Sequence, residues 1–96
     1  MRFLELIYDG NSIIDNNKIH NILEKENFHW LIDADIQDAK IEIKKHTLIW
    51  YSGYFYGNWQ YGIFKDGQFH GKFQNGILEG GNFKGEFISG INLISV

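Results

Sequence analysis

The 96-residue sequence contains no cysteine and no proline. Without cysteine, the chain cannot form disulfides, bind a metal through thiolates or use a cysteine nucleophile. Without proline, its tight turns must be built by glycine, asparagine and aspartate. No apolar run approaches the ~20 residues of a membrane-spanning helix, and the first residues do not follow the pattern of a secretory signal. We therefore expect a cytoplasmic protein with no membrane association.

Charge is also sparse and unevenly placed. The formal net charge is −3, which argues against binding nucleic acid through its phosphates. Residues 1–48 carry nine acidic and six basic side chains, whereas residues 49–96 carry three of each. The second half is instead rich in aromatic residues and glycine, and it holds the strongest pattern in the sequence.

That pattern is an internal repeat of 14 residues. Three blocks align without gaps, from Tyr54 to Gly67, from Gln68 to Gly81 and from Asn82 to Ser95, and residues 40–53 form a degenerate fourth. Each block has an aromatic residue at position 2, glycine at 4, an aromatic residue at 6, glycine at 9 and isoleucine at 10. These positions are Phe55, Phe69 and Phe83; Gly57, Gly71 and Gly85; Trp59, Phe73 and Phe87; Gly62, Gly76 and Gly90; Ile63, Ile77 and Ile91.

Alternation within the blocks indicates half-buried strands, with aromatic residues on one face and polar residues on the other. Dipeptides such as Asp66-Gly67 and Asn75-Gly76 are strong signals for hairpins. We therefore predict a mainly β fold, an antiparallel meander of glycine/aromatic β-hairpin repeats with an N-terminal strand and one short helix. Stacked hairpins would align the columns 55/69/83, 59/73/87 and 49/63/77/91. The glycine between two aromatic residues would leave a socket for a neighbouring ring.

The run Phe55-Tyr56-Gly57-Asn58-Trp59-Gln60-Tyr61-Gly62 resembles the opening half of a MORN repeat, Tyr-x-Gly-x-Trp-x-x-Gly. The equivalent runs from Phe69 and from Phe83 look similar, so the likeness covers residues 54–90. MORN-type arrays mostly serve as scaffolds and interaction surfaces, and the resemblance therefore implies a role in binding rather than catalysis.

A second resemblance competes with the first. Small residues precede apolar ones by two positions throughout the chain, as in the pentapeptide repeats that form a parallel β-helix. The steps are Ala34/Ile36, Ala39/Ile41, Gly53/Phe55, Gly62/Phe64, Gly67/Phe69, Gly76/Leu78 and Gly81/Phe83. Their spacing of 5, 5 and 4 is less regular than a pentapeptide coil requires. We therefore favour antiparallel hairpins and keep the parallel coil as the alternative.

Residues 1–33 lack the repeat and form an expected cap on the array of residues 34–96, within a single domain. A strand is predicted over residues 2–8, followed by a turn at Asp9, Gly10 and Asn11. Asp15 or Asn16 can cap a short helix through about Asn27, which would cover an open end or one face of the sheet. Residues 28–33 are predicted as a strand that leads into the repeats.

The chain carries no strong signal for chemistry. Asp33, Asp35 and Asp38 lack the glycine and the late glutamate of a calcium loop. The four histidines, His20, His29, His46 and His70, are spaced unlike zinc ligands. No serine lies in a nucleophile elbow, and no glycine-rich segment precedes a helix to hold phosphate. We therefore expect no metal, no cofactor and no enzymatic activity.

The candidate binding residues are exposed aromatic and polar side chains of the repeat, because tyrosine gives a large contact area with few rotatable bonds. Burial of the tyrosines under the helix is the competing interpretation. We expect a non-catalytic protein-binding module, a small accessory or inhibitory factor such as a phage-encoded protein acting on a host protein. The alternatives are a domain that binds a glycan or small ligand, and a homodimer or larger oligomer through residues 91–96. The candidate residues are Tyr51, Tyr54, Tyr56, Tyr61, His70 and Lys72.

Overall fold

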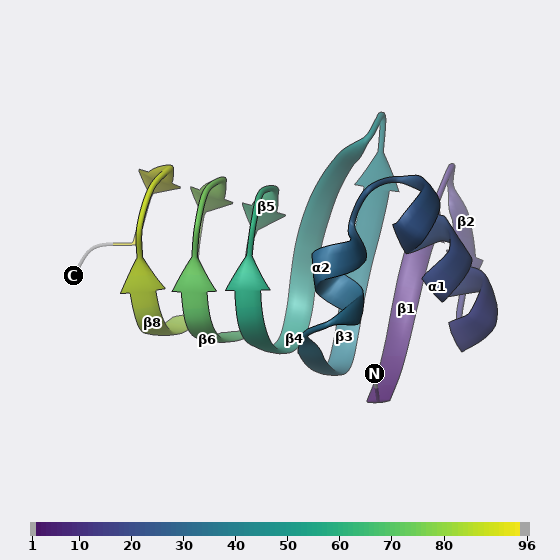
Figure 1. Cartoon of the computed structure of the whole chain (residues 1–96), viewed down its shortest axis with the longest axis horizontal. Helices are drawn as coiled ribbons and strands as arrows, with labels where there is room; N and C mark the ends of the chain where they lie inside the picture. Colours follow the sequence, from purple (N-terminus) through teal and green to yellow (C-terminus); the bar gives the residue numbers. More distant parts are fainter. Residues whose placement is uncertain (1, 95–96) are drawn as a thin grey trace.

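A computed structural model of the chain describes residues 2–94 and is mainly β, as predicted (Figure 1). Nine strands and two helices occur among these residues. They are β1 (Arg2–Tyr8), β2 (Asn11–Ile13), α1 (Asn16–Lys25), α2 (His29–Ile32), β3 (Asp35–Lys44), β4 (Thr47–Trp59), β5 (Ile63–Phe64), β6 (Gln68–Phe73), β7 (Ile77–Leu78), β8 (Asn82–Phe87) and β9 (Ile91–Asn92).

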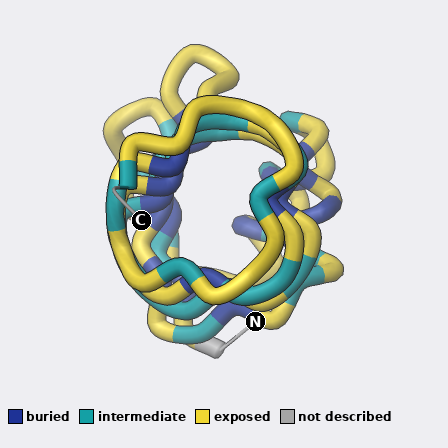
Figure 2. Tube along the Cα trace, turned by 90° about the vertical axis from the view of Figure 1, so that its left-hand side faces the viewer, coloured by how far each residue is buried: buried dark blue, intermediate teal, exposed yellow. Residues whose placement is uncertain are grey.

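The repeats form a coil of parallel strands, and the predicted antiparallel meander is wrong. Strands β4, β6 and β8 pair in parallel, with Phe55 opposite Phe69 and Phe69 opposite Phe83. Strands β5, β7 and β9 pair in parallel on another side of the coil. Seen along its axis, successive turns of the chain form rings that lie one behind another (Figure 2). Each 14-residue block is therefore one turn of a solenoid-like coil, nearer to the alternative arrangement than to stacked hairpins.

Backbone geometry at the turns explains why hairpins do not form. A two-residue hairpin turn of the favoured type requires positive φ at both central residues. Gly67 and Gly76 have φ of +122° and +119°, but the preceding Asp66 and Asn75 are not in the positive-φ region. Their side-chain oxygens instead accept hydrogen bonds from the glycine N–H groups, at 2.8 and 2.9 Å. The chain consequently turns a corner rather than reversing.

Glycine is required where neighbouring turns of the coil approach each other, not where rings need a socket. A Cβ on Gly71 would lie against the carbonyl oxygen of Gly57, and one on Gly85 would lie against that of Gly71. The same file continues into the N-terminal region of residues 2–46, which extends beyond the predicted cap and which we call the cap from here on. There, a Cβ on Gly57 would lie 2.9 Å from Cβ of Ala34. Close backbone packing, rather than space for an aromatic ring, therefore dictates the fourth position of each repeat.

The N-terminal region contains the true hairpins. Strand β1 reverses into β2 at Asp9 and Gly10, with φ of +50° and +79°, at the predicted turn. Strand β3 reverses into β4 at Lys45 and His46, with φ of +50° and +63°. Strand β1 also pairs in parallel with β3, so the cap sheet is mixed.

One predicted helix is confirmed and one predicted strand is replaced by a second helix. The side chain of Asp15 accepts hydrogen bonds from the N–H groups of Asn17 and Lys18 and so caps α1. Residues 28–33 contain α2 instead of a strand. The consecutive residues Trp30 and Leu31 are both buried, whereas a strand would direct one of them outward.

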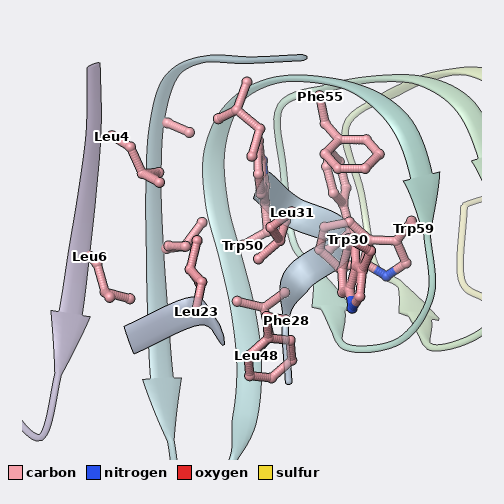
Figure 3. Close-up of a cluster of buried hydrophobic side chains, with 14 of the residues drawn as sticks. Leu4, Leu6, Leu23, Phe28, Trp30, Leu31, Leu48, Trp50, Phe55 and Trp59 are labelled. Carbon is pink, nitrogen blue, oxygen red and sulfur yellow. The ribbon is translucent and has the colours of Figure 1, made fainter. Parts of the chain in front are cut away.

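The buried core runs from the cap into the coil (Figure 3). Rings stack along the coil as predicted, with centroids 5.1 Å apart for Phe55 and Phe69 and 5.3 Å apart for Phe73 and Phe87. The predicted isoleucine column is in register from residue 49 to 91, but the fully buried column lies one residue later. It consists of Trp50, Phe64 and Leu78.

Candidate functional site

Four of the six predicted binding residues lie together on the outer surface of β4 and β6. We call Tyr54, Tyr56, His70 and Lys72 the tyrosine face. The His70 ring lies 5.4 Å from the Tyr54 ring and 6.2 Å from the Tyr56 ring, with an angle of 12° between the planes of His70 and Tyr56. The Tyr56 side chain is prominent, because 56% of the residue is exposed. The regular 14-residue offset thus brings aromatic groups of successive turns into one surface.

An open groove of about 510 Å³ adjoins the tyrosine face. Ala34, Gly57 and Gly71 contribute no side chain larger than a methyl group to its lining, so the backbone of adjacent turns is accessible there. Opposite charges occur in the lining, and its amide side chains include Asn58, whose Oδ1 accepts a hydrogen bond from Nε2 of Gln74 at 2.8 Å. The lining residues are Trp30, Asp33, Ala34, Tyr56, Gly57, Asn58, Gln60, Gly71 and Lys72.

Trp30 connects the groove to the core. Only 7% of this residue is exposed, and its ring meets Trp59 edge to face with centroids 4.9 Å apart. Its indole N–H has no hydrogen-bond partner within residues 2–94, and neither do those of the buried Trp50 and Trp59. Edge-to-face packing of this kind brings ring edges to neighbouring π faces. The groove wall at Trp30 is therefore held firmly by aromatic packing.

The other two predicted binding residues lie elsewhere. The Tyr51 hydroxyl donates a 2.6 Å hydrogen bond to Glu42, which raises the pKa of Tyr51 above its ordinary value of 10.0, with burial adding to the effect. The Tyr61 hydroxyl donates to the carbonyl oxygen of Asn27 at 2.8 Å, and its ring packs against Phe28 at 5.2 Å. Tyr61 thus fastens the connection between α1 and α2 to the coil. Neither tyrosine contributes to the tyrosine face.

Helix α1 does not bury the tyrosine face. Its apolar residues Ile19 and Leu23 are buried in the core with Leu4 and Leu6 of β1, at the end of the molecule away from the coil (Figures 1 and 3). The helix therefore covers the N-terminal part of the sheet. The Tyr56 ring packs instead beside a ring from the next turn.

Sequence reasoning did not find Trp30, Asp33, Asn58 and Gln60 as groove residues. In the sequence, Asp33 stands near Asp35 and Asp38, which lack the pattern of a calcium loop, and the two amides belong to the polar face of a predicted strand. The signal that could have found the groove is the file of small residues, in which Ala34 precedes Gly57 and Gly71. Recognising that file requires the parallel register, because Ala34 meets Gly57 only in the folded sheet.

A second polar cluster joins the cap to the β3–β4 turn. The Tyr8 hydroxyl donates to Oε2 of Glu26 at 2.8 Å, and Nδ1 of His46 lies 2.7 Å from Oε1 of the same carboxylate. The hydrogen bonds from His46 and then Tyr8 hold the pKa of Glu26 below its ordinary value, and the bond to Glu26 raises the pKa of Tyr8. This cluster connects the end of α1 to two hairpins and so has a structural explanation.

The described residues give no sign of a metal centre or a membrane span. Across residues 2–94, no group of three or more His, Asp or Glu side chains is arranged to hold a metal ion. Neither of the two helices in that range is long and apolar enough to cross a bilayer. Of the predicted dimer segment 91–96, residues 91–92 form β9, while Ser95 and Val96 lie outside the described residues.

Comparison with known proteins yields no relative: no family model, no curated protein and no solved structure matches the chain significantly. The similarity of residues 54–90 to MORN repeats, and of the small-x-apolar steps to pentapeptide repeats, therefore remains a similarity of short motifs.

Proposed function

We propose that the chain is a non-catalytic protein-binding module, a small accessory or inhibitory factor. Its docking surface is the tyrosine face together with the adjoining groove. One observation carries this proposal: 56% of the Tyr56 residue is exposed, yet its ring is stacked on His70 at the rim of a groove. An aromatic side chain held in this way contacts a partner with little further loss of conformational entropy.

The chemistry of the groove suits an extended segment of another protein. Asp33 and Lys72 offer opposite charges, and Asn58 and Gln60 offer amide donors and acceptors. Together with Tyr56, these groups provide an aromatic anchor and polar contacts at the rim, the usual composition of protein interfaces.

The test begins with selection of peptides from a displayed random library on the immobilised protein. Selected peptides are then measured by titration calorimetry against the wild type and the double variant Tyr54→Ala/Tyr56→Ala. We expect the double variant to lose binding by at least about tenfold, because it removes the aromatic anchors.

Ile14→Ala is the control, since Ile14 is a 66% exposed apolar residue between β2 and α1, and β1 and β3 separate β2 from β4 in the sheet. It should bind the same peptides as the wild type. Thermal unfolding establishes that each variant is folded. Undiminished binding by a folded double variant would show that another surface is the docking site.

A glycan is the second candidate ligand, and the composition of the groove favours it specifically. A tyrosine ring flanked by amide side chains and the Asp33 carboxylate provides the stacking surface and the hydrogen bonds that a sugar ring uses. Because Trp30 lines the groove, a bound oligosaccharide should change tryptophan fluorescence. Titration with an oligosaccharide panel separates the two functions. A saturable fluorescence change that is lost in the Asn58→Ala variant would favour glycan binding. No fluorescence change with any oligosaccharide would favour peptide binding.

A further inference from the structure

The C-terminal turn of the coil leaves strand edges and rings uncovered. Within residues 2–94, β8 pairs only with β6, and β9 only with β7, so their outer edges have no partner strand. Phe69 and Phe73 are fully buried, whereas their counterparts Phe83 and Phe87 are only partly buried. This end faces the viewer in Figure 2, where the ring of backbone is largely exposed. Such an edge is a ready template for another strand.

Further apolar side chains surround this open turn. Ile88, Ile91 and Leu93 are 47%, 54% and 62% exposed. Ile94 packs against the core, but Phe83 and Phe87 are still incompletely covered. The uncovered surface thus consists of apolar side chains of the coil interior, bordered by the unpaired edge of β8. Another strand could pair with this edge and cover these side chains.

The residues of β8 indicate which strand would fit. Around Gly85 they read Phe83, Lys84, Gly85, Glu86, Phe87, which is a chemical palindrome with opposite charges on its two sides. When two copies pair antiparallel about Gly85, Lys84 faces Glu86 of the second copy. Phe83 likewise faces Phe87 of the second copy. Rings then lie opposite rings on the inner face, and unlike charges lie opposite each other on the outer face.

The inner strands do not share this complementarity. In β6 the residues equivalent to Lys84 and Glu86 are His70 and Lys72. Antiparallel pairing of two β6 strands about Gly71 would place these two basic groups opposite each other. In β4 the equivalent residues are Tyr56 and Asn58, which carry no charge. Of these three stacked strands, only the one at the free edge is self-complementary in charge.

We propose that two copies of the chain associate through the free edges of β8, antiparallel and related by a two-fold axis at Gly85. Such an axis, perpendicular to the strand and through the coil, places the two apolar interiors end to end. The interface is isologous, so each copy supplies both members of every pair. It is a different surface from the tyrosine face, and it does not depend on the proposed peptide or glycan binding.

The size of the end face sets the expected strength. The two shorter dimensions of the molecule are 25 and 18 Å. A face of those dimensions is smaller than the roughly 800 Å² per partner of a standard stable interface. We therefore expect a reversible dimer, whose fraction rises with protein concentration across the micromolar to millimolar range.

Sedimentation velocity over a dilution series tests the proposal with charge reversal. Lys84→Glu places acidic groups opposite each other, and Glu86→Lys does the same with basic groups, so each variant alone should dimerise at least about tenfold more weakly. An equimolar mixture of the two variants should form a heterodimer. The double variant Lys84→Glu/Glu86→Lys should dimerise as the wild type does.

Lys40→Glu is the control, because Lys40 is an exposed lysine on β3, outside the end turn. It should leave the dimer unchanged, and circular dichroism should show that every variant is folded. A wild type that is monomeric at all concentrations would overturn the proposal and leave the edge for a strand of another protein. The proposal would also be overturned if the single variants dimerised as strongly as the wild type, or if the mixture of the two variants formed no heterodimer.

Discussion

The two halves of the molecule use the same residue types at turns and obtain opposite topologies. In the cap, Asp9 and Gly10 both have positive φ, and the chain reverses from β1 into the antiparallel strand β2. In the coil, only the glycine of Asn75-Gly76 has positive φ, and the chain turns a corner into a parallel stack. The number of left-handed residues at a turn, rather than the presence of an Asx-Gly dipeptide, thus decides between hairpin and coil.

A corner of the coil nevertheless continues into the cap. Gly53, Gly67 and Gly81 have φ between +96° and +122°, and Asp38 and Phe3 at the same position along the sheet have φ of +51° and +47°. The bend therefore runs from β1 through β8. The cap achieves it with non-glycine residues at some cost in strain, whereas the repeats use glycine.

The largest expected effect on stability comes from adding a methyl group to the stacked glycines Gly57, Gly71 and Gly85. Gly71→Ala would press Cβ against the Gly57 carbonyl at a φ of +105°, and we expect a loss of more than about 4 kcal/mol in the free energy of unfolding. In the cap, a Cβ on Gly10 would meet nothing within 4 Å, so Gly10→Ala should cost only its positive φ, about 1–2 kcal/mol. Urea denaturation followed by tryptophan fluorescence measures both. Equal losses would mean that backbone contact between turns is not what requires glycine.

The next effect compares an inner turn with the end turn. Phe69→Ala removes a fully buried ring stacked on both sides, at 5.1 Å from Phe55 and 5.0 Å from Phe83, and should cost about 3–4 kcal/mol. Phe83→Ala removes a partly buried ring and should cost about half as much. The same denaturation experiment at low protein concentration, where self-association is minimal, gives the difference. A loss for Phe83 as large as that for Phe69 would show that the end turn is already covered in the monomer.

Much of the fold could be predicted from the sequence, because its strongest signals are local or periodic. The 14-residue period predicted which residues stack, such as Phe55 on Phe69, and the side-chain cap of Asp15 predicted where α1 begins. The direction of the strands could not be predicted in this way. Parallel and antiparallel stacking align the same apolar columns, and the choice depends on φ at Asp66 and Asn75, which the residue types do not fix.

The candidate site was predictable in its exposed part and not in its groove. Tyr54, Tyr56, His70 and Lys72 share one side of neighbouring strands, which alternation within the repeat places correctly. Tyr51 and Tyr61 have the same residue type but are held by Glu42 and by the carbonyl of Asn27. Those partners are 9 and 34 residues away in sequence. The groove depends equally on long-range contact, since α2 brings Trp30 and Asp33 to the coil.

A smaller effect is expected in the polar contacts of the cap, which differ from the ring stacking that stabilises the coil. The pKa of Glu26 is lowered in the folded state, so its contribution to stability is present above the ordinary value of 4.5 and is lost as pH falls through the lowered value. Glu26→Gln should therefore cost about 1–2 kcal/mol at about pH 6, and less at about pH 3, because the stabilising charge is lost as pH falls through the lowered pKa. Denaturation midpoints of the wild type and variant at the two pH values measure this.

The matched control lies in the coil. Glu79 is 3.5 Å from Lys65 at the surface, and Glu79→Gln should change stability by less than about 0.5 kcal/mol at either pH. A cost for Glu26→Gln that does not shrink on acidification would indicate that the carboxylate charge is not what links Glu26 to His46 and Tyr8.

The smallest effect tests the corner that cap and coil share. Asp38 is exposed and has φ of +51°, so Asp38→Gly should relieve left-handed strain and raise stability by up to about 1 kcal/mol. Asp66, one residue before the coil's corner glycine, lies outside the positive-φ region and accepts a hydrogen bond from Gly67 N–H. Asp66→Gly should therefore lower stability by about 0.5–1 kcal/mol, through the added freedom of the unfolded chain. Calorimetric unfolding resolves the opposite signs. If both variants lost stability, Asp38 would adopt its positive φ in the cap without strain. The glycine at the coil's corner would then be needed for the contact between turns, and not for its positive φ.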